Sequence, residues 1–315
     1  MHRYIARRLA ALVGTILVAT AIANVLFATS IDQTPYGAAL RAVPGYLADT
    51  FLRGEFGTTG GGGCGAQSEG VFALCSTYGR GPVGEMLRQR GMVDLQLLIG
   101  GLLLGTLLGL FAGRYTSANP RKRRTRLIHG VTAVLMSCPP YFLAFMVLWY
   151  LAWNSGEFPL PFVSGQGDYV PFSEDPLGWT KAILAPWVLV ALPAAAFVAR
   201  MTEASMRDVL DADYIRTARA KGLPDKRVLN LHALPAAAPP IAALTGVNVS
   251  TMLINAAAIE YGFSLPGMFT TIRGAINVSD VAVLQAIVLE GVILVVIANF
   301  VADAVIARLD PRVWA

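Results

Sequence analysis

The sequence predicts an all-α integral membrane protein with about six transmembrane helices. The chain of 315 residues is 55% hydrophobic and only 14% charged, whereas soluble proteins average about 25% charged residues. Its mean hydropathy is +0.56, and the apolar residues gather in blocks of about 20, the length of helix that crosses a hydrocarbon core. Regions rich in Lys and Arg recur along the chain between the apolar blocks, which is typical of a multi-pass topology.

Six apolar segments qualify as spans. They cover residues 9–29, 95–112, 127–153, 183–199, 236–258 and 281–306. The first segment follows three arginines, and a basic stretch before an apolar core is also typical of a signal peptide. However, the segment is long for the core of a signal peptide, and no small-x-small cleavage site followed by a soluble domain is present. We therefore expect residues 1–29 to form an uncleaved N-terminal transmembrane helix.

Basic residues predict the side of the membrane on which each loop lies. They crowd the N-terminus, residues 114–126, residues 200–227 and the C-terminus, while the third and fifth loops hold only Lys181 and Arg273. Because loops rich in Lys and Arg stay in the cytoplasm, we expect both termini to be cytoplasmic. The formal charge of +5 is then a mark of topology and not of nucleic-acid binding.

The first outer loop, residues 30–92, carries a glycine run at 60–63 between its ends, followed by Cys64 and Cys75. Two cysteines in an oxidising compartment can close a small loop, and the glycines supply flexibility. We favour a Cys64–Cys75 disulfide; the alternative is two free thiols in a disordered insert. Cys138 lies inside an apolar block, as a small packing residue would.

The loop of residues 200–235 contains the densest helix signals outside the spans. Good helix formers run from 208 to 221 without a breaker, and Gly222 suits the left-handed residue that ends a helix. Pro224 can open a second helix, and Pro235 marks its end or the entry to the next span. A compact basic helix-turn-helix predicts a docking element, with an ordinary structured loop as the alternative.

This loop closely resembles the EAA loop of ABC-importer permeases in the dipeptide/oligopeptide branch. Arg216-Thr217-Ala218 stands at the place of the Glu-Ala-Ala triplet, Gly222 is in register, and His232-Ala233-Leu234-Pro235 ends the pattern. Ser264-Leu265-Pro266-Gly267 and Asp310-Pro311-Arg312 are also similar to that branch. The resemblance covers nearly the whole chain, but it is weak over residues 30–80, where the usual Pro-Gly-Asp-Pro is missing.

The resemblance implies a type I ABC-importer permease fold in a bacterial inner membrane. Residues 93–315 would form the permease domain, with 200–235 as a cytoplasmic coupling loop that docks on an ATPase. The implied coupling residues are Asp213, Tyr214, Ile215, Arg216, Thr217, Ala218, Lys221, Gly222, Pro224, Asp225 and Lys226. The implied cargo is di- or oligopeptides brought by an external binding protein, although relatives in this branch also move nickel, glutathione or sugars.

The resemblance also implies partners: a second homologous permease in a heterodimer, two ABC ATPase subunits, a solute-binding protein and the lipid membrane. The sequence contains no Gly-x-x-x-x-Gly-Lys-Ser/Thr loop, so ATP and Mg²⁺ are expected on the ATPase subunits. We expect no cofactor and no enzymatic activity in this chain. His2, His129 and His232 lack metal-ligand spacing, so no metal site is predicted.

Polar residues inside the predicted spans are candidates for a translocation path, because ionisable groups at membrane depth are costly. Glu290 either lines the path and meets the amine of a peptide, or makes a hydrogen bond between helices. The candidate set is Glu290, Asn248, Thr251, Asn255 and Asn299. A secondary transporter driven by an ion gradient is the alternative class, but such folds usually show internal repeats, and none is seen between the two halves.

Overall fold

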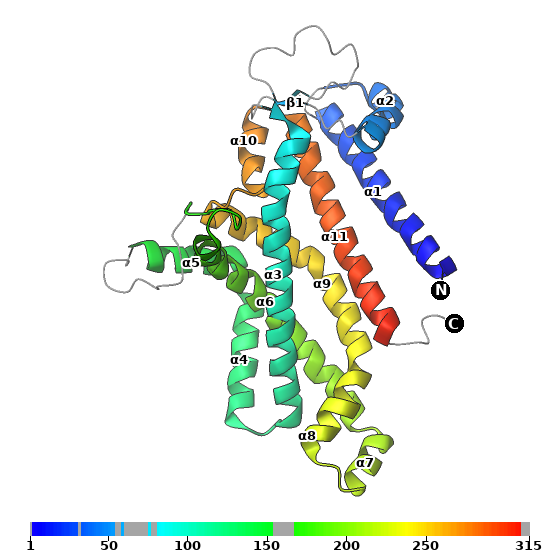
Figure 1. Cartoon of the computed structure of the whole chain (residues 1–315), viewed down its shortest axis with the longest axis vertical. Coiled ribbons are helices and arrows are strands. Elements are labelled where there is room, and N and C mark those ends of the chain that lie inside the picture. Colours follow the sequence, from blue (N-terminus) through cyan, green and yellow to red (C-terminus); the bar gives the residue numbers. More distant parts are fainter. Residues whose placement is uncertain are drawn as a thin grey trace. The chain divides into compact units, whose positions relative to one another are not determined.

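The computed structural model describes residues 2–30, 33–53, 58–59, 75–76, 81–153 and 167–309. Helices make up most of this part of the chain (Figure 1). The elements in chain order are α1 (His2–Ser30), α2 (Tyr36–Ala48), η1 (Asp49–Arg53), β1 (Thr58–Thr59), β2 (Cys75–Ser76), β3 (Gly81–Pro82), α3 (Val83–Ala118), α4 (Arg123–Ser137), α5 (Pro140–Trp153), α6 (Pro176–Leu210), α7 (Asp213–Ala220), α8 (Asp225–Arg227), η2 (Val228–Ala233), α9 (Leu234–Phe263), η3 (Phe269–Thr271), α10 (Ile272–Asn277) and α11 (Val281–Leu309).

Five helices are long and apolar enough to cross a membrane: α1, α3, α6, α9 and α11. A bent pair, α4 with α5, supplies a sixth span if its two parts are counted together. The prediction of a helical membrane protein with about six spans is confirmed. Several helices are longer than predicted because their polar end turns carry no hydropathy signal; α3 begins at Val83, so the loop expected to reach residue 92 ends earlier.

The third predicted span, residues 127–153, is wrong as a single helix. α4 ends at Ser137, α5 begins at Pro140, and their axes are bent by 100°. Pro139 and Pro140 have no N–H to continue the helical ladder. Cys138 adopts an extended conformation with φ −87° and ψ 125°, as expected of a residue that precedes proline. A hydropathy average over this segment does not register the break.

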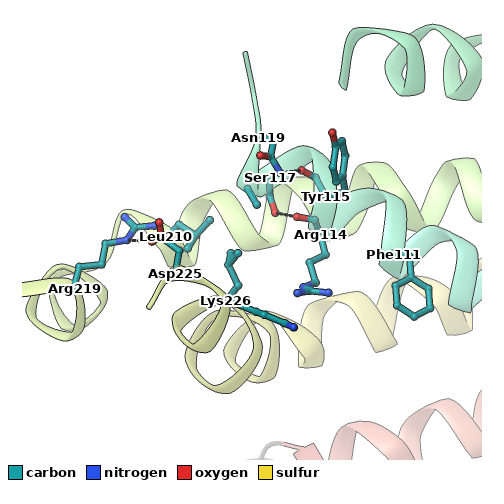
Figure 2. A pocket seen from close by; sticks show the side chains of 11 residues that line it. Phe111, Arg114, Tyr115, Ser117, Asn119, Leu210, Arg219, Asp225 and Lys226 are labelled. Carbon is teal, nitrogen blue, oxygen red and sulfur yellow. Dashed lines mark hydrogen bonds and ion pairs between the residues drawn. The ribbon is translucent and has the colours of Figure 1, made fainter. Parts of the chain in front are cut away.

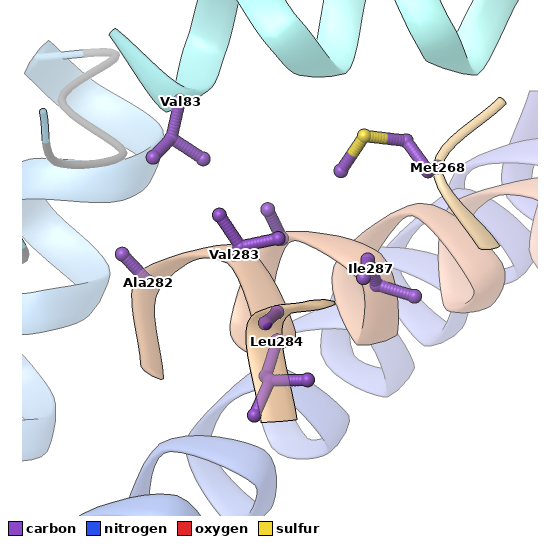
Figure 3. Packing of buried hydrophobic residues seen from close by; sticks show 8 residues of the cluster. Val83, Met268, Ala282, Val283, Leu284 and Ile287 are labelled. Carbon is purple, nitrogen blue, oxygen red and sulfur yellow. The ribbon is translucent and has the colours of Figure 1, made fainter. Parts of the chain in front are cut away.

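The chain divides into two compact units. The first unit joins Met1–Leu95 to Pro266–Ile297. Its apolar core contains residues from the start of α3, the η3–α10 segment and the first half of α11 (Figure 3). Val83 on α3 points toward Val283 on α11, and Met268 packs against the same cluster. A smaller cluster of Val25, Ala28 and Ala39 packs α1 against α2.

A small three-stranded sheet belongs to the first unit. Its strands lie in the order β2-β1-β3, with β1 parallel to β2 and antiparallel to β3. Thr58 pairs with Cys75 in this register. Cys64 lies outside the described residues, so the Cys64–Cys75 disulfide stays a prediction.

The second unit joins Gln96–Leu265 to Ala298–Ala315, and α3 packs against α6 within it. Four glycines at every fourth position of α3 form the contact: Gly101, Gly105, Gly109 and Gly113. A Cβ at Gly105 would lie 3.0 Å from the carbonyl oxygen of Ala191, and one at Gly109 would lie 2.8 Å from that of Ala195. The two backbones therefore approach as closely as small residues permit, which is how helices associate in lipid.

Gln96 on α3 organises the start of α6 in the second unit. Its Oε1 accepts hydrogen bonds from Nε1 of Trp179 (3.1 Å) and from the hydroxyl of Tyr169 (3.3 Å). Its backbone oxygen accepts one from Nε1 of Trp187 (2.9 Å), and Trp187 stacks edge-on against Trp179. Burial raises the pKa of Tyr169, so the phenol remains a donor at neutral pH.

We predict opposite effects of the same substitution at two helical glycines. Gly109→Ala should destabilise the protein by about 1–2 kcal/mol, because overpacking against α6 exceeds the roughly 1 kcal/mol that alanine gains in helix propensity. Gly130→Ala on α4, where nothing lies within 4 Å of the new Cβ, should raise stability slightly. Thermal unfolding in detergent measures both, and equal shifts of the two midpoints would contradict the α3–α6 packing.

Candidate functional site

The loop of residues 200–235 folds into a helical elbow made of α7, a turn at Gly222 and α8. Gly222 has φ +80°, so the predicted left-handed residue is confirmed. The N–H of Leu223 donates to the carbonyl of Ala218 (3.3 Å), and the N–H of Gly222 donates to that of Arg219 (2.9 Å). This pair of hydrogen bonds is the Schellman motif that closes a helix C-terminus. Figure 1 shows α7 and α8 at the ends of α6 and α9.

Ile215 anchors α7 to the two neighbouring spans. Its side chain is fully buried in a cluster with Met206 of α6, Val228 of η2 and Ala237 of α9. Burying a side chain of this size contributes roughly 1.5–3 kcal/mol. The elbow is therefore packed onto α6 and α9 rather than tethered to them as a free loop.

The predicted coupling residues form one exposed surface, apart from buried Ile215 and half-buried Ala218. Exposed on α7 are Asp213, Tyr214, Arg216 and Thr217, and exposed on the turn and α8 are Lys221, Gly222, Pro224, Asp225 and Lys226. Arg219 pairs with Asp225 across the turn at 3.4 Å. Two exposed charges at this distance contribute little to stability, so the surface remains available to a partner.

One detail of the predicted helices in this loop is wrong. The helix expected over 208–221 is broken, because α6 runs to Leu210 and α7 begins at Asp213. Of the two roles predicted for Pro235, the entry to the next span is confirmed, since Pro235 is the second residue of α9, directly after the π-helical turns of η2. Helical structure continues through it from Asp225 to Phe263.

An ionic cluster joins α4 to the end of α6, and sequence reasoning missed it. Oε2 of Glu203 lies 2.7 Å from Nε2 of His129, and Arg207 forms an ion pair with the same carboxylate. Glu203 is buried, whereas His129 and Arg207 are partly exposed. The i,i+4 spacing of Glu203 and Arg207 was visible as a helical pair, but their contact with His129 requires the fold.

Glu290 of α11 is buried in the first unit beside Asp94 of α3. Within the described part of the chain, neither oxygen of the Glu290 carboxyl group has a hydrogen-bond partner. Oδ2 of Asp94 accepts a hydrogen bond from the backbone N–H of Met268 (2.8 Å). Both alternatives for Glu290, the translocation path and a hydrogen bond between helices, stay predictions.

The other translocation candidates lie in the second unit. Asn248, Thr251 and Asn255 share one face of α9 at helical spacing, with Thr251 exposed and the two asparagines half-buried. Asn299 of α11 lies close to Gly246 of α9, whose added Cβ would be 3.7 Å from its Oδ1. Asn248, Thr251 and Asn255 therefore mark one polar side of α9, whereas Gly246, and with it Asn299, lies on the opposite side of that helix at 3.6 residues per turn. The role of these four residues in transport stays a prediction.

The comparison with solved structures identifies the fold as that of an ABC-importer permease. A chain of the inward-facing MetNI methionine ABC transporter matches it with a TM-score of 0.54 and 19% identity, over 72% of this chain and 97% of that chain. That likeness concerns the fold alone.

The protein belongs to the family described as binding-protein-dependent transport system inner membrane component, whose model matches residues 105–315. The dipeptide transport system permease protein DppB of Lactococcus lactis subsp. cremoris is 30% identical over 78% of this chain and 76% of its own length. The oligopeptide transport system permease protein OppB of Mycobacterium tuberculosis (strain ATCC 25618 / H37Rv) is 29% identical over 83% and 77%, respectively. The chain is thus a multi-pass inner-membrane component of such a transport system.

Asp94→Ala should lower the free energy of unfolding by about 1–3 kcal/mol, because the buried N–H of Met268 loses its acceptor. Asp94→Asn keeps an acceptor oxygen and should retain most of the stability. Asp49→Ala is the matched control, since the carboxylate of Asp49 forms an exposed ion pair with Arg53 (2.7 Å), and its loss should change stability by less than about 1 kcal/mol. Thermal unfolding midpoints of the three variants check this, and equal losses in Asp94→Ala and Asp49→Ala would refute it.

Proposed function

We propose that the protein is a permease subunit for ATP-driven import of di- or oligopeptides delivered by an external binding protein. The observation that carries the proposal is the exposed α7–α8 elbow, packed through Ile215 onto two membrane spans. The relatives named as dipeptide and oligopeptide permeases support the substrate class. Import of nickel, glutathione or another small solute is the alternative within the same family.

The proposed assembly pairs this chain with a second, homologous permease and two ABC ATPase subunits, which bind ATP and Mg²⁺. Each permease forms half of the translocation path. The polar side of α9 and Asn299 in the second unit, together with Glu290 in the first, are the residues proposed to line this path.

The elbow supplies a physical route from ATP hydrolysis to the membrane spans. A partner that grips the exposed face of α7 displaces Ile215, which is buried among residues of α6, η2 and α9. Because a close-packed core deforms little, α6 and α9 move with the elbow. Closure of the ATPase subunits would thus change the arrangement of the spans.

Charge placement supports cytoplasmic termini and a cytoplasmic elbow. The basic residues of 114–126 and of 200–227 belong on the same side of the membrane. α4, α5 and α6 connect these two segments, so they share a side only if the bent α4–α5 pair crosses the bilayer once. We therefore propose that the pair is a broken span and not a re-entrant loop.

Cysteine labelling tests this topology. In a background without the native cysteines, Asp168→Cys should react with a membrane-impermeant maleimide on cells whose inner membrane is intact. Arg121→Cys and Arg227→Cys should react only after that membrane is opened. If the cysteines at positions 121 and 227 reacted from opposite sides of the membrane, the bent α4–α5 pair would not cross the bilayer.

Gly222→Val tests the coupling role of the elbow. A β-branched residue at φ +80° costs at least about 1–2 kcal/mol, so the elbow should distort and ATP-dependent uptake should fall about tenfold. The measurement is accumulation of a labelled dipeptide in proteoliposomes that contain the whole complex and its binding protein.

Gly222→Asn is the control, because asparagine tolerates the left-handed conformation better than valine and should retain more uptake. Nothing lies within 4 Å of a Cβ at this position, so the two variants differ in backbone strain and not in steric room. Full uptake by an assembled Gly222→Val complex would refute the coupling role. Uptake that glutathione or nickel inhibits and dipeptides do not would refute the peptide substrate.

A further inference from the structure

A cavity of about 490 Å³ lies where the end of α3 meets the elbow in the second unit. Arg114, Tyr115, Ser117 and Asn119 line it from α3 and the turn after it, and Lys226 lines it from α8. Figure 2 shows Arg114 extending from α3 toward the helix that carries Lys226, with the Arg219–Asp225 pair at one end. A volume of this size is typical of small-ligand sites.

The cavity carries positive charge without a matching acid. Its lining includes Arg114, Arg219, Lys226 and Asp225, and Asp225 already pairs with Arg219. Within the described part of the chain, Arg114 and Lys226 have no ion-pair partner. Nε of Arg114 is itself buried and has no hydrogen-bond partner among these residues, although a buried guanidinium donor is costly to leave unpaired. The lining therefore fits an anionic group.

An exposed apolar stripe on α3 leads to this cavity. Leu103, Leu107, Leu108 and Phe111 lie on one side of the helix and are about half exposed or more. Phe111 also lines the cavity, with Leu210 and Leu229 on the opposite elements. A ligand that joins a negatively charged group to a hydrocarbon chain matches both features, because its chain can lie on the stripe while its charge enters the cavity.

We propose that this cavity binds the phosphate of an anionic phospholipid from the cytoplasmic leaflet. Arg114 and Lys226 contact the phosphate, Ser117 and Asn119 supply further polar groups, and an acyl chain lies along α3 over Phe111. Basic pockets between helices at the cytoplasmic surface are suited to such headgroups. The proposal rests on the proposed orientation, and it places a lipid beside the elbow, where its presence would stiffen the contact between α3 and α8.

The test is lipid retention by the whole complex after reconstitution in nanodiscs of phosphatidylglycerol and phosphatidylcholine. Native mass spectrometry after gentle extraction should show phosphatidylglycerol bound in preference to phosphatidylcholine. Arg114→Gln should weaken this retention about fivefold, the contribution of one basic residue near an anionic surface. Arg114→Lys should keep most of it, since it keeps the charge.

Arg124→Gln is the matched control, because it removes the same charge from an exposed position that does not line the cavity. Equal retention in Arg114→Gln and Arg124→Gln would overturn the proposal. Displacement of the lipid by millimolar inorganic phosphate or glycerol phosphate would overturn the lipid source and assign the site to a soluble anion. Lipid retention is measured without ATP or peptide. A negative result for the lipid site can therefore be distinguished from a negative result for the proposed transport function.

Discussion

The close approach of α3 and α6 is the constraint on which the second unit depends. Lipid offers apolar helices no hydrophobic reason to associate, so close van der Waals contact has to supply the attraction. The glycines at 101, 105, 109 and 113 bring the α3 backbone onto α6. α6 in turn contacts α4 through Glu203 and the elbow through Met206. α3 thus packs against the helix that carries both Glu203 of the ionic cluster and Met206, which contacts Ile215 of α7.

The elbow separates anchoring from recognition on a single short helix. Ile215 faces the ends of α6 and α9, whereas Tyr214 and Arg216, its sequence neighbours, are exposed. An eight-residue helix is too short to be stable alone, so α7 owes its shape to this packing and to the hydrogen bonds around Gly222. A partner thus meets a preformed surface and loses little conformational entropy on binding.

Much of the fold and part of the site could be predicted from the sequence. The spans follow from runs of apolar residues, and the left-handed turn follows from Gly222, because both signals are local. Pro139 and Pro140 are a local signal for the bend at Cys138, but the apolar residues on both sides make the whole segment look like one continuous span. Asp94 and Glu290 lie close together in the fold, as do His129 and Glu203, although each pair is far apart in the chain. No local sequence pattern predicts which polar groups come into contact.

The 100° bend between α4 and α5 has a consequence for the surrounding bilayer. Two helices at that angle cannot both run along the membrane normal, so a pair that crosses the bilayer has at least one strongly tilted part. A 14-residue helix such as α5 is about 21 Å long and about 10 Å wide, and the more it is tilted towards the membrane plane, the more lipid it displaces from the leaflet that holds it. The protein would then have an asymmetric footprint, and its conformational energy would respond to the lateral pressure and area of one leaflet more than of the other.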